Sequence, residues 1–169
     1  EYRNLVEKRD VDAIVGYISS GNCQALAPIA EELKQFTIFA TCGTPRIFEE
    51  AERKYVFRTM GHATSDNVAA AMYVKENFPE VKGYTGINQN YAWGQDSWRD
   101  FDLTMKQIMP NTKASEKTQF PKIFAGQYGS EISAMSLDKA DLVHSSFWGG
   151  DLEAFIFQGA ARGLFKKKI

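Results

Sequence analysis

The sequence lacks the features that mark several common classes of protein. Its 169 residues carry 20 basic and 21 acidic side chains, and this near-balance leaves no excess positive charge for binding nucleic acid. No apolar stretch approaches the ~20 residues that a membrane-spanning helix needs. A GxGxxG fingerprint, a Walker loop and a GxSxG elbow are also absent, so no motif indicates a nucleotide cofactor or a serine hydrolase.

Cysteine and histidine are scarce. The chain has Cys23, Cys42, His62 and His144, and their spacing does not match a metal site. The two cysteines would pair only if the strand ends that carry them are neighbours; otherwise they are packed, like most isolated cysteines in α/β sheets. Cys42 with either histidine offers a nucleophile and a base, but nothing in the sequence places them together. His144 lies in an apolar run, so we expect it to be structural.

What the sequence has instead is a repeated alternation of short apolar runs and amphipathic segments. The apolar runs predict extended segments, most of them strands, at residues 12–18, 36–41, 55–59, 82–88 and 141–147, and a more polar strand is expected at residues 112–118. Apolar positions three and four residues apart predict helices at residues 24–35, 67–77, 95–109, 129–137 and 151–162. Pro28 is expected in the first turn of its helix, which would then begin near residue 26.

This alternation predicts an α/β fold with parallel sheets and right-handed crossovers. Only two clear strands precede Gly61, which is too few for an independent sheet. The small, polar stretch 61–66 suits a hinge or a crossover. We therefore expect two lobes, with residues 1–60 forming an incomplete first lobe and residues 61–169 forming most of the second.

Small and polar residues follow the first two predicted strands, where a parallel α/β sheet binds its ligands. A helix N-terminus beside Ser20 would suit an anion, although ordinary capping by Ser20 or Asn22 explains the same residues. Gly43 would let the backbone approach a ligand closely, or it serves only the geometry of a turn. The candidate ligand-binding residues of the first lobe are Ser19, Ser20, Gly21, Cys42, Gly43 and Thr44.

Aromatic residues follow the strands predicted at residues 82–88 and 141–147. Single aromatic side chains usually belong to a core, but three of them in glycine-flanked loops favour a pocket that holds the apolar body of a ligand. An aspartate at the helix start would accept from an ammonium group or cap its own helix. The candidate ligand-binding residues of the second lobe are Tyr91, Trp93, Trp148, Gly149 and Asp151.

In this order the clusters resemble the type I periplasmic solute-binding proteins of ABC transporters, specifically the branched-chain amino acid (leucine/isoleucine/valine-binding) family. The resemblance covers nearly the whole chain. Its matching stretches are VDAIVG at 11–16, SSG at 19–21, APIAEE at 27–32, YVFRT at 55–59, NYAWGQD at 90–96 and SSFWGGD at 145–151.

The resemblance implies two Rossmann-like lobes with parallel sheets, joined by a three-stranded hinge and closing on a ligand. It implies a protein about twice this long, of which this chain would be an interior portion with the first lobe incomplete. It also implies export to the periplasm, or display outside the cell as a membrane-anchored lipoprotein. An ABC permease would be the partner, and no cofactor or metal is implied.

By position, the resemblance assigns the ligand carboxylate to Ser20 and Gly21, and the carboxylate and ammonium groups to Gly43 and Thr44. Tyr91 and Trp93 would form one pocket wall, with Trp148, Gly149 and Asp151 lining the second lobe. The sequence departs from the family where Cys42-Gly43-Thr44 replaces the commoner Gly-Ala-Thr and where Trp93 replaces a tyrosine. The ligand therefore stays open among amino acids, amides, urea-like solutes and aromatic acids.

Three functions follow from these observations. The leading prediction is a non-enzymatic receptor of an ABC importer that binds an amino acid or a related small carboxylate or amide by hinge closure. The second is the ligand-binding ectodomain of a sensor, or a regulator, with the same fold. The third is an α/β enzyme that uses Cys42.

Overall fold

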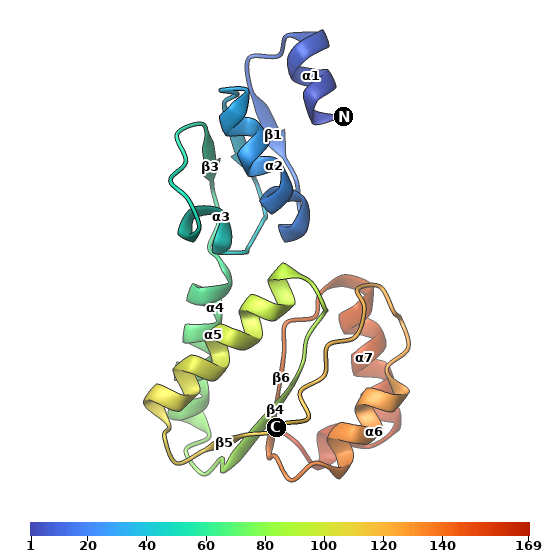
Figure 1. Cartoon of the computed structure of the whole chain (residues 1–169). Helices are drawn as coiled ribbons and strands as arrows, with labels where there is room; N and C mark the ends of the chain where they lie inside the picture. Colours follow the sequence, from blue (N-terminus) through green and yellow to red (C-terminus); the bar gives the residue numbers. More distant parts are fainter. The chain divides into compact units, whose positions relative to one another are not determined.

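The computed structural model describes residues 1–169 (Figure 1) and divides into two compact units, Glu1–Ala63 and Thr64–Ile169. The sequence predicted this division between residues 60 and 61. Each unit contains its own parallel sheet. None of the helices combines the length and the apolar character that crossing a membrane requires.

Unit 1 (residues 1–63) is built on a three-stranded parallel sheet in the order β1-β2-β3. Residues 55–59, predicted only as a short extended segment, supply the third strand. The elements of unit 1 are α1 (Tyr2–Arg9), β1 (Ile14–Gly16), α2 (Ser20–Glu32), β2 (Thr37–Phe39), α3 (Arg46–Glu49) and β3 (Val56–Arg58).

Helix α2 begins at Ser20, earlier than predicted, so Pro28 lies inside the helix and not in its first turn. Tertiary packing explains the difference. Cys23, Ala27 and Ala30 have no exposed surface and belong to the core of unit 1. Burial of this face outweighs the one helical hydrogen bond that an exposed proline removes.

Unit 2 (residues 64–169) is an α/β unit whose parallel strands lie in the order β5-β4-β6. Helix α4 begins at Ala63, so most of the predicted hinge at 61–66 is helical. The elements are α4 (Ala63–Asn77), β4 (Gly83–Ile87), α5 (Ala92–Ile108), β5 (Lys113–Ala114), α6 (Gly129–Leu137), β6 (Leu142–Ser145), α7 (Gly149–Ala161) and the 3₁₀ helix η1 (Leu164–Lys166).

Both faces of the unit 2 sheet are covered by helices. Successive residues of β4 point to opposite faces, so Tyr84 packs in one cluster with Phe101 of α5, and Ile87 packs in another with Phe155 of α7. Helices α4 and α5 cover the first face and α6 and α7 the second (Figure 1). The three-layer arrangement agrees with the α/β fold predicted from the sequence.

Strand β5 is shorter than the predicted strand at 112–118. Only Lys113 and Ala114 pair with β4, and Gln119 adds an isolated bridge to Ile87. The Ser115 hydroxyl explains the interruption, because it accepts a hydrogen bond from the amide of Lys117 at 3.0 Å and turns the chain.

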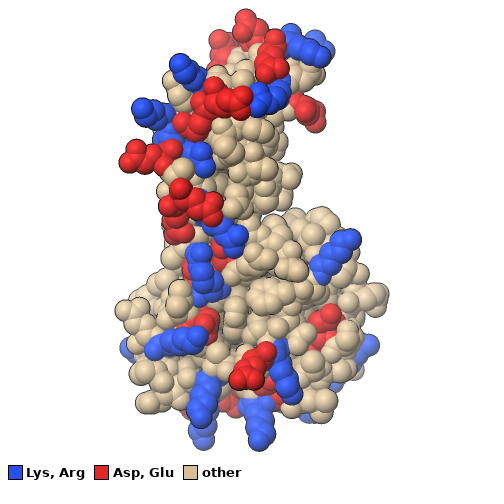
Figure 2. Space-filling view, viewed as in Figure 1, with Lys and Arg blue, Asp and Glu red and all other residues tan.

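Charged side chains of both signs occur on the visible face of each unit, without a continuous basic stripe (Figure 2). This distribution agrees with the balanced composition of 20 basic and 21 acidic residues.

Candidate functional site

In unit 1 the loops that follow β1 and β2 meet at the carboxyl ends of the strands. The Ser20 hydroxyl, at the start of α2, accepts a hydrogen bond from the backbone amide of Thr44 at 3.2 Å. Ser20 and Thr44 are buried, whereas Gly21 on the same turn is exposed and Ser19 is half-buried. The two predicted clusters of unit 1 therefore lie together. The alternative that Ser20 or Asn22 caps α2 is wrong, because Ser19 is the N-cap residue and no side chain caps the helix.

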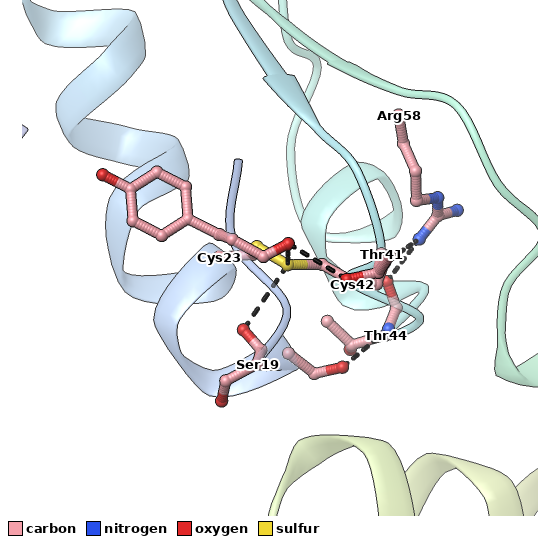
Figure 3. Close-up of a disulfide and its surroundings, with 8 residues drawn as sticks. Ser19, Cys23, Thr41, Cys42, Thr44 and Arg58 are labelled. Carbon is pink, nitrogen blue, oxygen red and sulfur yellow. Dashed lines mark hydrogen bonds between the residues drawn. A yellow bond between two sulfur atoms is a disulfide. The ribbon is translucent and has the colours of Figure 1, made fainter. Parts of the chain in front are cut away.

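A disulfide between Cys23 and Cys42 ties α2 to the loop after β2 (Figure 3). The Cα atoms are 6.3 Å apart and both side chains have no exposed surface. The sequence left this pairing open and favoured simple packing. The structure corrects the third alternative: the sulfur of Cys42 is covalently bound, so it is not a free nucleophile. A contact of Cys42 with a ligand stays a prediction.

The sulfur of Cys42 also lies 3.5 Å from the backbone oxygens of Tyr17 and Ser19 (Figure 3). A disulfide sulfur has no proton to donate, so these are close contacts and not hydrogen bonds. They show how tightly the two loops approach each other.

Arg58, on β3, is a site residue that the sequence analysis did not identify. Its Nη1 atom donates to the backbone oxygens of Thr44 at 2.7 Å and of Cys42 at 3.3 Å (Figure 3). The guanidinium carbon lies 5.2 Å from the centre of the Phe48 ring. Burial lowers the pKa of Arg58. In the sequence, Arg58 stood out only as part of the matching stretch YVFRT, and that match assigned no role to it.

In unit 2 the aromatic residues after β4 and β6 are joined by hydrogen bonds. Tyr91 is the N-cap residue of α5 and Trp93 lies in its first turn. The indole nitrogen of Trp93 donates to the backbone oxygen of Ser146 at 2.9 Å, and that of Trp148 donates to the Tyr91 hydroxyl at 2.8 Å. The structure thus brings Tyr91, Trp93 and Trp148 together, each half-buried, at the carboxyl ends of two adjacent strands.

A family model described as "periplasmic binding protein" matches residues 1–169. The chain belongs to the periplasmic binding protein family. This confirms the family predicted from the sequence, whereas the branched-chain amino acid ligand stays a prediction.

Several solved structures resemble this periplasmic binding protein. A solute-binding protein of an ABC transporter from R. palustris, in complex with 4-hydroxybenzoate, is 21% identical with a TM-score of 0.84, and the match covers 99% of this chain and 44% of that one. A second R. palustris solute-binding protein, in complex with benzoate, is 22% identical with a TM-score of 0.85 over 96% of this chain and 44% of that one. A leucine-binding protein from Thermotoga maritima is 19% identical with a TM-score of 0.81, and the match covers 95% of this chain and 44% of that one.

These similarities establish the type I periplasmic binding protein fold. The chain spans about 44% of the length of the solved structures it matches. A search of curated proteins gave no match.

Two further predicted residues of this periplasmic binding protein lie at the start of α7. Gly149 is exposed with a φ of +55°, a conformation that favours glycine. Asp151 is 2% exposed, and its Oδ2 atom accepts hydrogen bonds from Gln89 Nε2 at 2.6 Å and from the amide of Phe124 at 2.8 Å. Asp151 was predicted to line the pocket. In the structure the carboxylate is enclosed by groups of its own unit, and its contact with a ligand stays a prediction.

Asp151 stays ionised in this environment. Burial opposes ionisation, but hydrogen bonds from Tyr128, Gln89 and the backbone amides outweigh it and lower the pKa of Asp151. Burial, together with the nearby Asp151, also raises the pKa of Tyr128. Asp151 therefore holds the loop 119–128 in place through these hydrogen bonds.

Phe124 is a second residue that the sequence analysis missed. Its side chain is 69% exposed and its φ is +60°. The ring centre lies 5.8 Å from that of Trp148, with the planes at 81°. No local pattern marks Phe124, because the irregular loop that carries it has no periodicity.

His144 is structural, as expected. It is 8% exposed, its Nε2 atom lies 2.7 Å from Oδ1 of Asn67, and its ring stacks on Phe101 with centres 4.3 Å apart. Burial lowers the pKa of His144 to about 3, so the imidazole is neutral at pH 7. No group of three or more His, Cys, Asp or Glu residues is arranged to hold a metal ion.

Proposed function

We propose that this chain is part of the solute receptor of an ABC importer, which binds an amino acid or a related small carboxylate or amide. The carrying observation is that the predicted residues at the strand ends lie together within each unit: Ser20 with Thr44, and Tyr91 with Trp93 and Trp148. The first set is polar and the second aromatic. A solute with a polar head and an apolar body needs both kinds of surface.

The polar set suits a carboxylate. Ser19 and Gly21 form the accessible first turn of α2, a 13-residue helix whose N-terminal amides favour an anion. Ser20 and Thr44 are buried behind this turn and stabilise it through their hydrogen bond. The absence of an acidic side chain among these residues is consistent with an anionic ligand group.

The aromatic set suits the body of the solute. Relatives of the same fold bind 4-hydroxybenzoate, benzoate and, by name, leucine, so both aromatic and aliphatic bodies are reasonable candidates. We further propose that the protein acts in the periplasm and that it delivers the solute to a membrane permease. No catalytic step is part of this proposal.

A ligand screen tests the proposal. Full-length protein, unfolded and refolded to remove bound solute, is heated with amino acids, amides and aromatic acids, each added singly. A solute at 100 times its Kd adds about 2.7 kcal/mol to stability, so we expect the melting temperature to rise by a few degrees for a small subset of the panel. If no solute raises the melting temperature of the folded protein, the proposal is wrong.

Gly21→Tyr tests the position of the site. An added Cβ at Gly21 would meet only the Ser19 hydroxyl at 3.8 Å, so the fold accepts the substitution, while the ring covers the amides of α2. We expect binding to be lost at an unchanged melting temperature. Ala25→Tyr, also exposed and one turn further along α2, is the matched control and should bind normally.

A further inference from the structure

We propose that Phe124, together with Trp148 and Tyr91, forms a wall that selects a solute with a planar aromatic ring. The inference rests on the proposed function and narrows its ligand class. It assigns a specificity-determining role to Phe124, which neither the sequence pattern nor the family relationship indicates.

The conformation of Phe124 is unfavourable for folding alone. A φ of +60° is rare for a bulky residue, because the Cβ atom crowds the backbone. The ring is also 69% exposed, so it gains little from burial. An exposed phenylalanine is common, but a strained one is not, and such outliers concentrate where a side chain must be held in place for binding.

Buried groups impose this conformation. The amide of Phe124 donates to the buried carboxylate of Asp151 at 2.8 Å. Further along the loop, the amide of Tyr128 donates to Oε1 of Gln158 at 2.8 Å, and Nε2 of Gln158 donates to the oxygen of Gly126 at 3.0 Å. The loop is thus hydrogen-bonded to α7 at several points, and these bonds hold the backbone that carries the Phe124 ring.

The rings define what this wall accepts. The planes of Phe124 and Trp148 meet at 81°, with centres 5.8 Å apart. The indole N–H groups of Trp148 and Trp93 already have acceptors, in Tyr91 and Ser146, so the indoles offer apolar surface and not donors. The Tyr91 hydroxyl accepts from Trp148 and keeps its own proton to donate.

A third ring fits such a corner because it can stack on one face and meet the other ring edge to face. Both arrangements add to the energy of simple burial, and an aliphatic body of equal size gains only the burial. We therefore expect aromatic solutes to bind more tightly than saturated ones of the same size and charge.

Benzoate and cyclohexanecarboxylate are the two probes, since they share the carboxylate and the six-carbon ring and differ in planarity and π electrons. Titration calorimetry on the full-length, ligand-free protein should give roughly three- to tenfold tighter binding of benzoate. Phe124→Gly should lose about tenfold in benzoate affinity and most of the preference. Phe124→Leu should keep the affinity for cyclohexanecarboxylate but lose the preference, so that its benzoate affinity falls to the same level.

The glycine variant also separates binding from folding. Glycine adopts a φ of +60° without strain, so its melting temperature should be equal to or higher than that of the parent. Phe157→Ala, which removes a 73% exposed ring from α7, is the matched control and should keep the preference.

Three results would overturn the inference. These are equal binding of the two probes by the parent protein, a preference that survives in Phe124→Gly, and a lower melting temperature of Phe124→Gly, which would mean that the ring serves stability. If amino acids or amides bind and benzoate does not, the inference fails while the solute-receptor proposal stands. If nothing in the ligand screen binds, both fail.

Discussion

The two units hold the loops at the ends of their strands by different means. In unit 1 the loop residues are small, and a disulfide and the Arg58 guanidinium fix them. In unit 2 the residues are aromatic, and their own indole N–H groups bind the neighbouring loop. An aromatic side chain supplies contact area and a donor together, whereas glycine and serine supply little area. Small loop residues therefore need a separate support.

The two sheets also differ in how far their faces are covered. In unit 2 both faces pack against helices. In unit 1 the neighbouring residues Val15, Ile38 and Phe57 share one face, and Val15 and Phe57 are 68% and 47% exposed. Parallel sheets are normally covered on both faces. Unit 2 should therefore be the more stable unit of this chain at neutral pH.

Acid should lower the stability of unit 2. The pKa of His144 is about 3 in the folded state and near its ordinary 6.5 when unfolded, so the unfolded state binds more protons between these values. The stabilisation is complete above pH 6.5 and is lost as the pH falls towards 3. The loss in unit 2 is on the order of 4 kcal/mol. The loss of stability in unit 2 is measured by comparing the hydrogen-exchange protection of the two units at pH 7 and at pH 4.

His144→Gln is the control for the acid effect. Glutamine keeps a donor for the Asn67 side chain but does not titrate, so unit 2 of this variant should lose much less protection at pH 4. Equal protection of the parent unit 2 at both pH values would show that the pKa of His144 is not depressed.

Loss of the disulfide should weaken unit 1 alone. Cys23 and Cys42 are 19 residues apart, and opening a loop of this size costs about 3 kcal/mol by chain entropy. Cys23→Ser combined with Cys42→Ser, or reduction with dithiothreitol, should accelerate exchange in unit 1. Unit 2 contains no cysteine and serves as the internal control. A matching change in unit 2 would mean that the two units do not unfold separately.

Arg58→Gln should have a smaller effect in the same unit. It removes the charged donor from the oxygens of Thr44 and Cys42, and we expect a loss of about 2 kcal/mol. Urea unfolding of the single variant, the cysteine double variant and their combination forms a double-mutant cycle. If the two supports hold the same loop, the combined loss will differ from the sum of the separate losses; strict additivity would argue against a shared role.

Much of the fold followed from local patterns. Strands and helices recur with periods of two and 3.6 residues, and adjacent parallel strands bring their carboxyl ends together, so the clusters that follow the strands were expected at the carboxyl ends of the sheets. The hydrogen bonds of Ser20 with Thr44 and of Tyr91 with Trp148 were not predicted. The early start of α2 was not expected, because it depends on the packing of Cys23 and Ala27 in the core of unit 1.

The missed features depend on distances that no local pattern encodes. The Cys23–Cys42 bond needs the Cα separation of 6.3 Å, which only the assembled sheet provides. The burial of Asp151 depends on the loop 119–128 folding back on it, and Phe124 owes its position to that same carboxylate. A residue at a strand end is thus predictable as part of a group that lies together, but whether it is accessible or supports another residue is not.

Tyr91→Phe tests the aromatic support with the smallest expected effect. The substitution keeps the ring and removes the acceptor of the Trp148 indole N–H, a half-buried hydrogen bond worth about 1 kcal/mol. The stability of unit 2 should fall by this amount, and the fluorescence of Trp148 should change because its indole loses its partner. In the variant Tyr73→Phe, an exposed tyrosine of α4 loses its hydroxyl instead, and both signals should stay unchanged. If Tyr91→Phe also leaves them unchanged, the hydrogen bond between Trp148 and Tyr91 does not hold the loops together.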